Sequence, residues 1–181
     1  MLYLKSMSID RFKSFKHINV IFNKGFNCIV GPNGSGKSNI IDALLFSLGE
    51  SSLHRLRVDR LQYLIREGSS RGAASMSKAH VKIELDGDEK MEITRGIRAD
   101  GKTVYRLNGK RMTRQEVIEV LKKHSVHIDE TSTIAQGEIN KIIEANAKQR
   151  REFIDIAAGI QEFEYKKREA MQELEKVGVR K

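Results

Sequence analysis

Residues 26–46 read FNCIVGPNGSGKSNIIDALLF, an apolar run followed by a glycine-rich turn and a second apolar run. The turn fits the pattern G-x-x-x-x-G-K-[ST] of phosphate-binding loops, with its fixed positions at Gly31, Gly36, Lys37 and Ser38. Before the turn, residues 26–30 predict a buried strand. After it, apolar side chains recur at helical spacing as far as Leu48, and Gly49 is placed to end the helix. Strand, loop and helix therefore follow in the order that such a loop requires.

The residue types in this loop suit a phosphate group. Gly34 and Gly36 can adopt backbone angles closed to other residues, so the N–H groups of residues 33–38 can turn inward around phosphate oxygens. The N-terminus of the following helix adds the positive end of its dipole. Lys37 supplies a positive charge for the β- and γ-phosphates, and the Ser38 hydroxyl is the expected ligand of a bridging Mg²⁺. The alternative is a glycine turn that only links strand to helix, and the intact lysine and serine argue against it.

The composition indicates one globular domain with a basic surface. The chain has 181 residues, of which 39% are hydrophobic, and a formal net charge of +9 from 33 basic and 24 acidic residues. This excess favours polyanionic partners, although a mixed charged surface without such a role is the alternative. The single cysteine, Cys28, is expected to pack in the core without a disulfide partner. No segment approaches the about 18 apolar residues of a membrane span, so we expect a soluble, cytoplasmic chain with no membrane partner.

Alternating hydrophobicity predicts further strands on both sides of the loop helix. They are expected at residues 3–9, 17–22, 79–85, 90–97 and 103–109, and the last three should form an antiparallel meander with turns at Asp86-Gly87 and Asn108-Gly109. A capping box at residues 113–116 starts a helix, and further helices are expected at 139–145 and 148–158. Between Ile160 and Val177, steps of 3 and 4 residues indicate the start of a coiled coil, with an ordinary amphipathic helix as the alternative.

The chain lacks groups that nucleotide hydrolysis requires besides the loop. An acidic residue at the end of a second buried strand should complete the Mg²⁺ shell or accept a proton. The nearest candidate, residues 125–130, ends in Asp-Glu, but Ser125 and His127 interrupt what should be a buried strand. His124 and His127 lack metal-site spacing, so no metal besides Mg²⁺ is expected. The sequence also contains neither L-S-G-G nor N-K-x-D. By its own residues the chain is a nucleotide binder with half of a site.

Four stretches resemble the SMC (structural maintenance of chromosomes) family, in particular the N-terminal half of the ATPase head of the prokaryotic condensin type. They are RFKSF at 11–15, GPNGSGKSNIIDALLFSLG at 31–49, QGEI at 136–139 and RREFIDIAAGIQEFEYKKREA at 150–170. The loop alone would fit any ATP-binding-cassette protein. The last stretch is the specific one, because it matches the place where an SMC head passes into its coiled coil.

The resemblance implies an α/β fold, a P-loop NTPase of the ABC type with an antiparallel β meander and a mixed central sheet. It implies that residues 1–159 form the N-terminal lobe of the head and that residues 160–181 begin the outgoing coiled-coil helix. In this family the acidic and signature motifs lie in a C-terminal half that folds back and completes the sheet. The implied partners are that C-terminal half, a second head in a homodimer, a kleisin subunit with its accessory subunits, and DNA bound without sequence preference. The implied location is the cytoplasm, in association with the nucleoid.

The resemblance also assigns roles to individual residues. ATP contacts are expected from Pro32, Asn33, Gly34, Ser35, Gly36, Lys37, Ser38 and Asn39. Arg11, Lys13 and Ser14 match the segment near the adenine. Gln136 matches a glutamine on Mg²⁺ and the attacking water, so Ser38 and Gln136 are the expected metal ligands. Arg57, or alternatively Arg60, matches an arginine that approaches the nucleotide and links DNA to hydrolysis, so Lys37, Gln136 and Arg57 are the expected catalytic residues. A surface arginine without this role is the other reading of Arg57.

The resemblance implies an ATPase that acts in chromosome condensation and segregation. Two heads would engage around ATP and separate on hydrolysis, which would move the attached coiled coils. Alone, this chain is expected to bind ATP with Mg²⁺ without significant turnover. The nearest alternative is a related coiled-coil DNA-repair ATPase, of the double-strand-break-repair Rad type or RecN. A stand-alone P-loop kinase or ATPase is the alternative from a different class.

Overall fold

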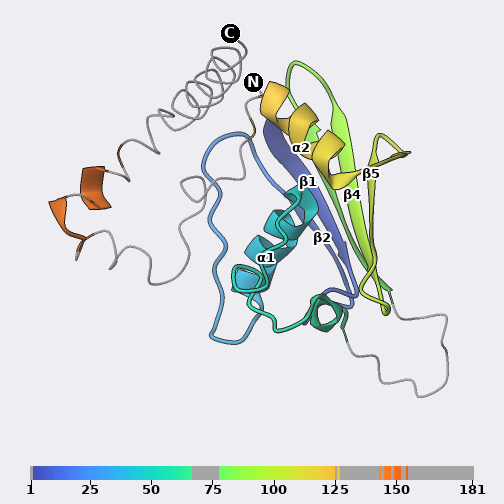
Figure 1. Cartoon of the computed structure of the whole chain (residues 1–181), viewed down its shortest axis with the longest axis horizontal. Coiled ribbons are helices and arrows are strands. Elements are labelled where there is room, and N and C mark those ends of the chain that lie inside the picture. Colours follow the sequence, from blue (N-terminus) through green and yellow to red (C-terminus); the bar gives the residue numbers. More distant parts are fainter. Residues whose placement is uncertain are drawn as a thin grey trace, which may run out of the picture. The chain divides into compact units, whose positions relative to one another are not determined.

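The computed structural model describes residues 2–66 and 78–124, together with positions 126, 143, 145–147, 149–151 and 154. The chain divides into two compact units, Met1–Ile128 and Asp129–Lys181. The strands and helices named below all belong to the first unit (Figure 1). Within the described residues, no helix has both the length and the apolar character of a membrane span.

A six-stranded antiparallel sheet forms the frame of the first unit. In chain order its strands are β1 (Tyr3–Asp10), β2 (His17–Ile21), β3 (Lys78–Asp86), β4 (Met91–Arg98), β5 (Thr103–Leu107) and β6 (Lys110–Met112). In space the order is β2-β1-β3-β4-β5-β6, so β1 pairs with both β2 and β3. The long connection from β2 to β3 carries helix α1 (Lys37–Leu48) and the short 3₁₀ helix η1 (Leu61–Leu64).

The predicted meander is confirmed, and its strands follow from alternating hydrophobicity. In β3 and β4 buried residues alternate with partly exposed ones along the whole strand, as expected for a sheet with one face in the core. Asn108 and Gly109 have φ of 49° and 80°, which is the backbone of a type I′ hairpin turn. This turn adds β6, a strand that the sequence pattern did not predict, with Leu107 opposite Lys110.

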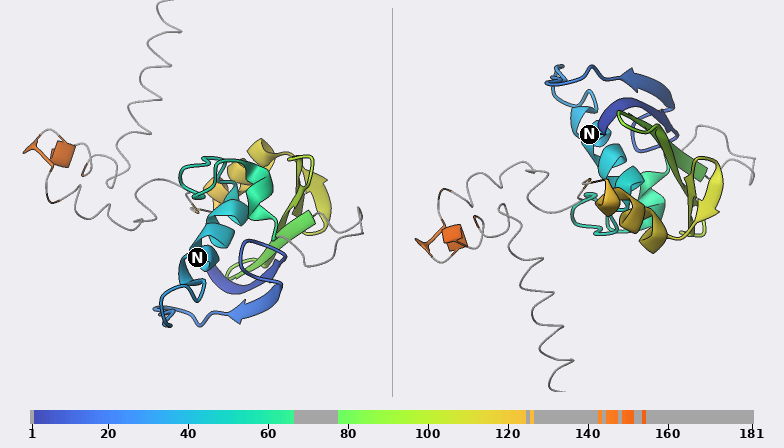
Figure 2. Two further views of the ribbon diagram at one scale, coloured as in Figure 1. Left: turned by 90° about the horizontal axis from the view of Figure 1, so that it is seen from below. Right: turned by 90° about the horizontal axis from the view of Figure 1, so that it is seen from above.

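Two helices cover the same face of the sheet, as both views in Figure 2 show. Helix α1 packs against β3 and β4, and helix α2 (Arg114–Lys123) packs against β5. The predicted C-terminus of α1 and the predicted N-terminus of α2 are confirmed. Gly49 terminates α1 in the left-handed conformation, and the capping box of Thr113 and Glu116 begins α2. The core between the layers is built from Met7, Ile9, Phe46, Val81, Ile83, Ile93, Ile97, Val117 and Leu121.

The strand predicted at residues 26–30 is not formed. Phe26 is 93% exposed and Val30 is 82% exposed. Cys28 is exposed too, so the expectation that it packs in the core is wrong. A strand needs neighbours that pair with its N–H and C=O groups, and no described strand pairs with this segment. Residues 26–30 therefore add no parallel strand to the sheet. All strand pairs among the described residues are antiparallel, and the expected mixed central sheet is not found among them.

Several predictions fall wholly or mostly outside the described residues. They concern the Asp-Glu segment at 125–130, the helix at 139–145 and the coiled-coil start at 160–181. Of the helix predicted at 148–158, positions 149–151 and 154 are described and helical. Asn146 and Gln149 exchange capping hydrogen bonds of 2.9 and 3.0 Å there.

Candidate nucleotide-binding site

The predicted phosphate loop leads into α1 with its glycines in the backbone conformation that the motif predicts. Gly34 and Gly36 have φ of 80° and 96°. Gly36 is the N-cap of α1, no side chain of the described residues caps this helix end, and the first turn carries no acidic residue. The first N–H groups of α1 and the positive end of its dipole are therefore available to an anion.

Lys37 lies over this loop. Its Nζ donates hydrogen bonds of 2.7 Å to the carbonyl oxygens of both Gly31 and Pro32. An ammonium group held by two carbonyls of an exposed loop can exchange them for phosphate oxygens at small cost, since both sets of partners are acceptors. Ser38 lies exposed in the first turn of α1. The loop thus fits a phosphate group, and Ser38, the predicted Mg²⁺ ligand, lies next to Lys37 at the start of α1.

The corner at residues 11–15 packs directly against the loop. A methyl group at Gly36 would lie 2.9 Å from Phe15 Cζ and 3.0 Å from Ser14 Oγ. Asn39 Nδ2 donates to Ser14 Oγ at 2.8 Å. In the same corner, Phe12 packs against Phe46 of α1, with ring centroids 5.3 Å apart. The structure therefore brings Ser14 beside Gly36 and Asn39, two of the residues for which ATP contacts are predicted.

A buried carboxylate that the sequence analysis did not identify connects two further predicted residues. Asp42 is 3% exposed, and its Oδ2 lies 2.5 Å from both Lys13 Nζ and Arg57 Nη2. Lys13 Nζ also donates to the carbonyl oxygen of Leu56 at 2.6 Å. The available sequence signal was an aspartate among the apolar residues of an amphipathic helix, one turn after Ser38.

Arg57 also reaches Asn39 Oδ1, at 3.5 Å, whereas Arg60 lies exposed at the N-cap of η1. Arg11 contributes backbone hydrogen bonds to Lys16 and Arg66. Gln136 lies outside the described residues.

Two arginines hold the opposite end of α1. Arg95 of β4 is 2% exposed and donates to the carbonyl oxygens of Phe46 and Glu50 at 2.8 and 2.6 Å. Its guanidinium lies 4.0 Å from the Phe46 ring centroid and 4.7 Å from that of Tyr105. Burial lowers the pKa of Arg95 to about 10 and raises the pKa of Tyr105.

Arg114 Nε adds a 2.7 Å hydrogen bond to the carbonyl oxygen of Gly49. Cations thus meet the negative end of the helix whose positive end faces the phosphate loop. No sequence pattern indicated this arrangement, because an arginine in an amphipathic strand ordinarily lies on the exposed face.

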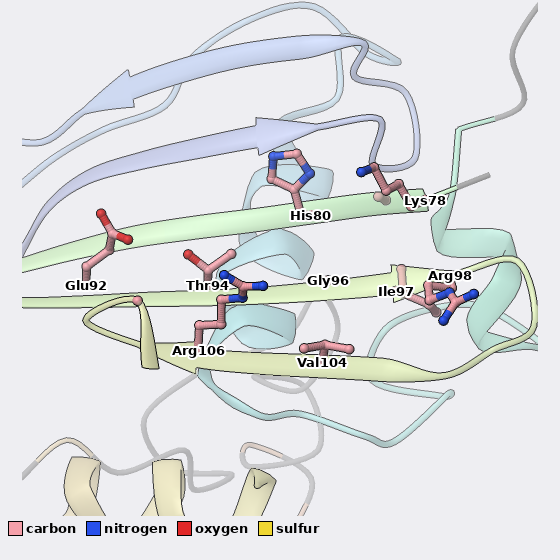
Figure 3. A pocket seen from close by; sticks show the side chains of 11 residues that line it. Lys78, His80, Glu92, Thr94, Gly96, Ile97, Arg98, Val104 and Arg106 are labelled. Atoms are coloured by element: carbon pink, nitrogen blue, oxygen red, sulfur yellow. The ribbon is translucent and has the colours of Figure 1, made fainter. Parts of the chain in front are cut away.

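A groove lies on the open face of the sheet, on the side away from α1 (Figure 3). Lys78 and Arg98 lie at one end of it and Glu92 at the other, with His80 and Arg106 between them. Three permanent cations and one carboxylate give this surface a basic character. Among the described residues, no group of three or more histidine, cysteine or acidic side chains could hold a metal ion.

Comparison with known proteins gives a consistent set of relatives. Residues 3–138 match the family described as RecF/RecN/SMC N terminal domain. The chromosome partition protein Smc of Gloeobacter violaceus is 37% identical, and the match covers 99% of this chain and 16% of that protein. The chromosome partition protein Smc of Pyrococcus furiosus is also 37% identical, over 96% of this chain and again 16% of the relative. The chain thus spans about one sixth of the length of the curated relatives it matches.

Solved structures agree with the sequence relatives. The Smc head domain of Pyrococcus furiosus with an extended coiled coil, bound to the C-terminal domain of ScpA, matches with a TM-score of 0.78 and 38% identity. That match covers 97% of this chain and 46% of the solved one. A structure from work on ATP-driven dimerization and DNA-stimulated activation of SMC ATPases matches with a TM-score of 0.75 and 36% identity. It covers 84% of this chain and 98% of the solved one.

Proposed function

Because this chain belongs to the SMC family and matches the N-terminal part of an SMC head, we propose that it supplies the ATP-binding wall of that head. One observation carries the proposal: the loop from Gly31 to Gly36 leads into a helix whose first turn has no acidic residue and whose N-terminus is capped by no side chain in the described part of the chain. Lys37 lies over the same loop. Backbone N–H groups, helix dipole and ammonium group together form a site for the phosphates.

In this proposal each part of the site has one task. Residues Pro32 to Asn39 bind the phosphates, and the ammonium of Lys37 neutralises charge on the β- and γ-phosphates. Ser38 and Gln136 would hold Mg²⁺, which would supply positive charge to neutralise the phosphates. The segment with Arg11, Lys13 and Ser14 lies near the adenine. Arg57 approaches the phosphates from the side of Asn39, which its guanidinium already contacts.

The site is incomplete in this chain, and a C-terminal half of the same head is proposed to complete it. The exposed apolar side chains of Phe26, Ile29 and Val30 support this proposal, because a surface of this kind usually marks an interaction site. The paired strands of that half would give residues 26–30 the neighbours that they lack. In this arrangement residues 1–159 are the N-terminal lobe, and residues 160–181 begin the coiled coil.

The proposed work is conformational. Two heads bind ATP between them as a homodimer, and a higher affinity of ATP for the engaged state shifts the equilibrium toward engagement. Hydrolysis then releases the heads and moves the coiled coils, in chromosome condensation and segregation at the nucleoid in the cytoplasm. ATP-driven dimerization is the subject of the work on one solved relative, which supports this step for the present chain.

DNA and a kleisin subunit with its accessory subunits are the proposed partners. A solved relative is bound to the C-terminal domain of ScpA, which supports a similar partner here. For DNA, support comes from the net charge of +9 and from the groove lined by Lys78, Arg98 and Arg106. Such cations contact phosphates without reading bases, so the binding would be independent of sequence.

The test is calorimetric titration of the 181-residue chain with Mg-ATP. We expect binding, and we expect Lys37→Ala to weaken it by about 10- to 100-fold, because a charged partner of the phosphates is lost. The control is Lys102→Ala, since the Lys102 side chain is 80% exposed in the β4–β5 turn and lies in no part of the site. Turnover should be at background for the chain alone and appear when a C-terminal head half is added.

Two results would count against the proposal. Equal affinities of wild type and Lys37→Ala would remove the phosphate site. Turnover by the isolated chain would contradict the incomplete site and favour a stand-alone P-loop kinase or ATPase. A related DNA-repair ATPase of the Rad type or RecN shares the loop, and the composition of the following coiled coil would distinguish it.

A further inference from the structure

Asp42 joins three separate segments at the first turns of α1. Its Oδ2 accepts from Lys13, in the corner after β1, and from Arg57, in the segment before η1. It lies four residues after Ser38 and three after Asn39, on the helix face that these residues share. Its side chain is 5% exposed, whereas that of Arg57 is 48% exposed. A buried carboxylate thus pairs with a half-exposed arginine near the phosphate loop.

Both cations that meet Asp42 have strained backbones. Lys13 has a φ of 48° and Arg57 a φ of 53°, a region that non-glycine residues rarely adopt. Strain of this kind persists only where the surrounding contacts determine the conformation, and it gathers at functional sites. The second contact of Lys13, with the carbonyl oxygen of Leu56, fixes the residue that precedes Arg57.

Among the described residues, the hydrogen-bond partners of the Arg57 guanidinium lie on one side of it. The same terminal nitrogen serves Asp42 Oδ2 and Asn39 Oδ1, and a guanidinium carries five N–H groups. Donors therefore remain for another acceptor. Anchoring a flexible arginine through one nitrogen reduces the rotamer freedom that it would lose on binding an anion.

We propose that Asp42 is a positioning residue for the nucleotide: its carboxylate holds the Arg57 guanidinium beside Asn39, with donor groups left for the phosphates. The inference rests on the proposed function, since it requires phosphates at the loop. Lys13 has a separate, structural task, because it ties the corner after β1 to Leu56. Asp42 acts on the nucleotide through Arg57 and does not touch it.

A double-mutant cycle on Mg-ATP affinity tests this coupling in the 181-residue chain. Asp42→Asn keeps the shape of the side chain and removes its charge, and Arg57→Met keeps the length of the arginine without its donors. We expect each single variant to weaken binding by about 10-fold, the scale of positioning residues around bound ligands. In the Arg57→Met background, Asp42→Asn should change the affinity by less than about 2-fold. In a Lys13→Met background its effect should persist.

A merely structural role predicts different results. If Asp42 only stabilised the fold, Asp42→Asn would weaken binding equally with and without Arg57, and the coupling would be absent. If Arg57→Met alone leaves ATP affinity unchanged, the inference fails whatever Asp42→Asn does to folding, and circular dichroism verifies that each variant is folded. The proposed function is judged separately: a Lys37-dependent affinity with no effect at Arg57 overturns the inference alone, whereas loss of the Lys37 effect overturns both.

Discussion

The contact between the phosphate loop and the corner at residues 11–15 predicts a strict requirement for glycine at position 36. The substitution Gly36→Ala adds one methyl group at a φ of 96°. The same methyl group would lie 2.9 Å from Phe15 Cζ and 3.0 Å from Ser14 Oγ. A Cβ contact shorter than 3.0 Å essentially never occurs and one of 3.0 Å is tight, so the Phe15 ring or the loop must move.

The expected cost has two parts. A positive φ in an alanine costs about 1–2 kcal/mol, and forcing an extra methyl group into a packed contact costs about 1–3 kcal/mol. Gly36→Ala should therefore lower the free energy of unfolding by about 2–5 kcal/mol, a large share of the about 5–15 kcal/mol typical of a domain. Gly34 isolates the first part, because its φ is 80° and no atom of the described residues lies within 4 Å of an added methyl group.

The assay is equilibrium unfolding in urea of wild type, Gly34→Ala and Gly36→Ala. We expect Gly36→Ala to be less stable than Gly34→Ala by about 1–3 kcal/mol, the packing part of the cost. Phe15→Leu removes the ring atoms nearest the added methyl group. In that background the difference between the two alanine variants should shrink.

Equal stabilities of the two alanine variants would refute the reasoning, since they would show that the corner does not press on the loop. If the stability difference between the two alanine variants is unchanged in the Phe15→Leu background, the contact is instead with Ser14, whose Oγ also lies close to the added methyl group. A cost below about 0.5 kcal/mol for both variants, the range of neutral surface changes, would contradict the backbone strain as well.

Two further predictions concern stability. Arg95→Ala removes two hydrogen bonds to α1 and leaves a cavity beside Phe46, so we expect the free energy of unfolding in urea to fall by about 3–5 kcal/mol. Arg95→Met fills the space without a buried charge and should recover most of this stability. Equal losses of stability in the two variants would contradict this account. The hydrogen bond from the Thr113 backbone N–H lowers the pKa of Glu116 from 4.5. The Glu116 carboxylate therefore stabilises the fold above pH about 4.5. This stabilisation is lost as the pH falls through the lower pKa of the folded state. Glu116→Gln should therefore be less stable than wild type near neutral pH and equal to it in acid, in unfolding measured across pH; a constant difference would count against the capping box.

Much of the fold was predictable because its signals are local. The left-handed glycines of the loop, the Gly49 terminus of α1 and the capping box of α2 each depend on residues within a few positions. The strands β3 and β4 follow from a two-residue period. In the candidate site the same holds for Lys37, whose two carbonyl partners lie five and six residues away.

The prediction at residues 26–30 failed for the opposite reason. An apolar run indicates that a segment is suited to burial. Burial of a strand also needs a neighbouring strand, which the run itself does not contain. In the described residues this partner is missing, and Phe26 is exposed. The contacts of Asp42 with Lys13 and Arg57, and those of Arg95 with the end of α1, were not predicted. A charged residue in a local pattern does not indicate its distant partner.

By itself, the sequence determined which local structures form: a phosphate loop ahead of a helix with an open N-terminus, and alternating strands that make a sheet with one buried face. Only the tertiary structure decided which side chains meet at the site. Lys13 and Asp42 are 29 residues apart, Arg57 and Asp42 are 15 apart, and Arg95 reaches a helix end 49 residues earlier. Contacts at such separations depend on strand order and on how the layers pack, and no local pattern of residue types encodes either.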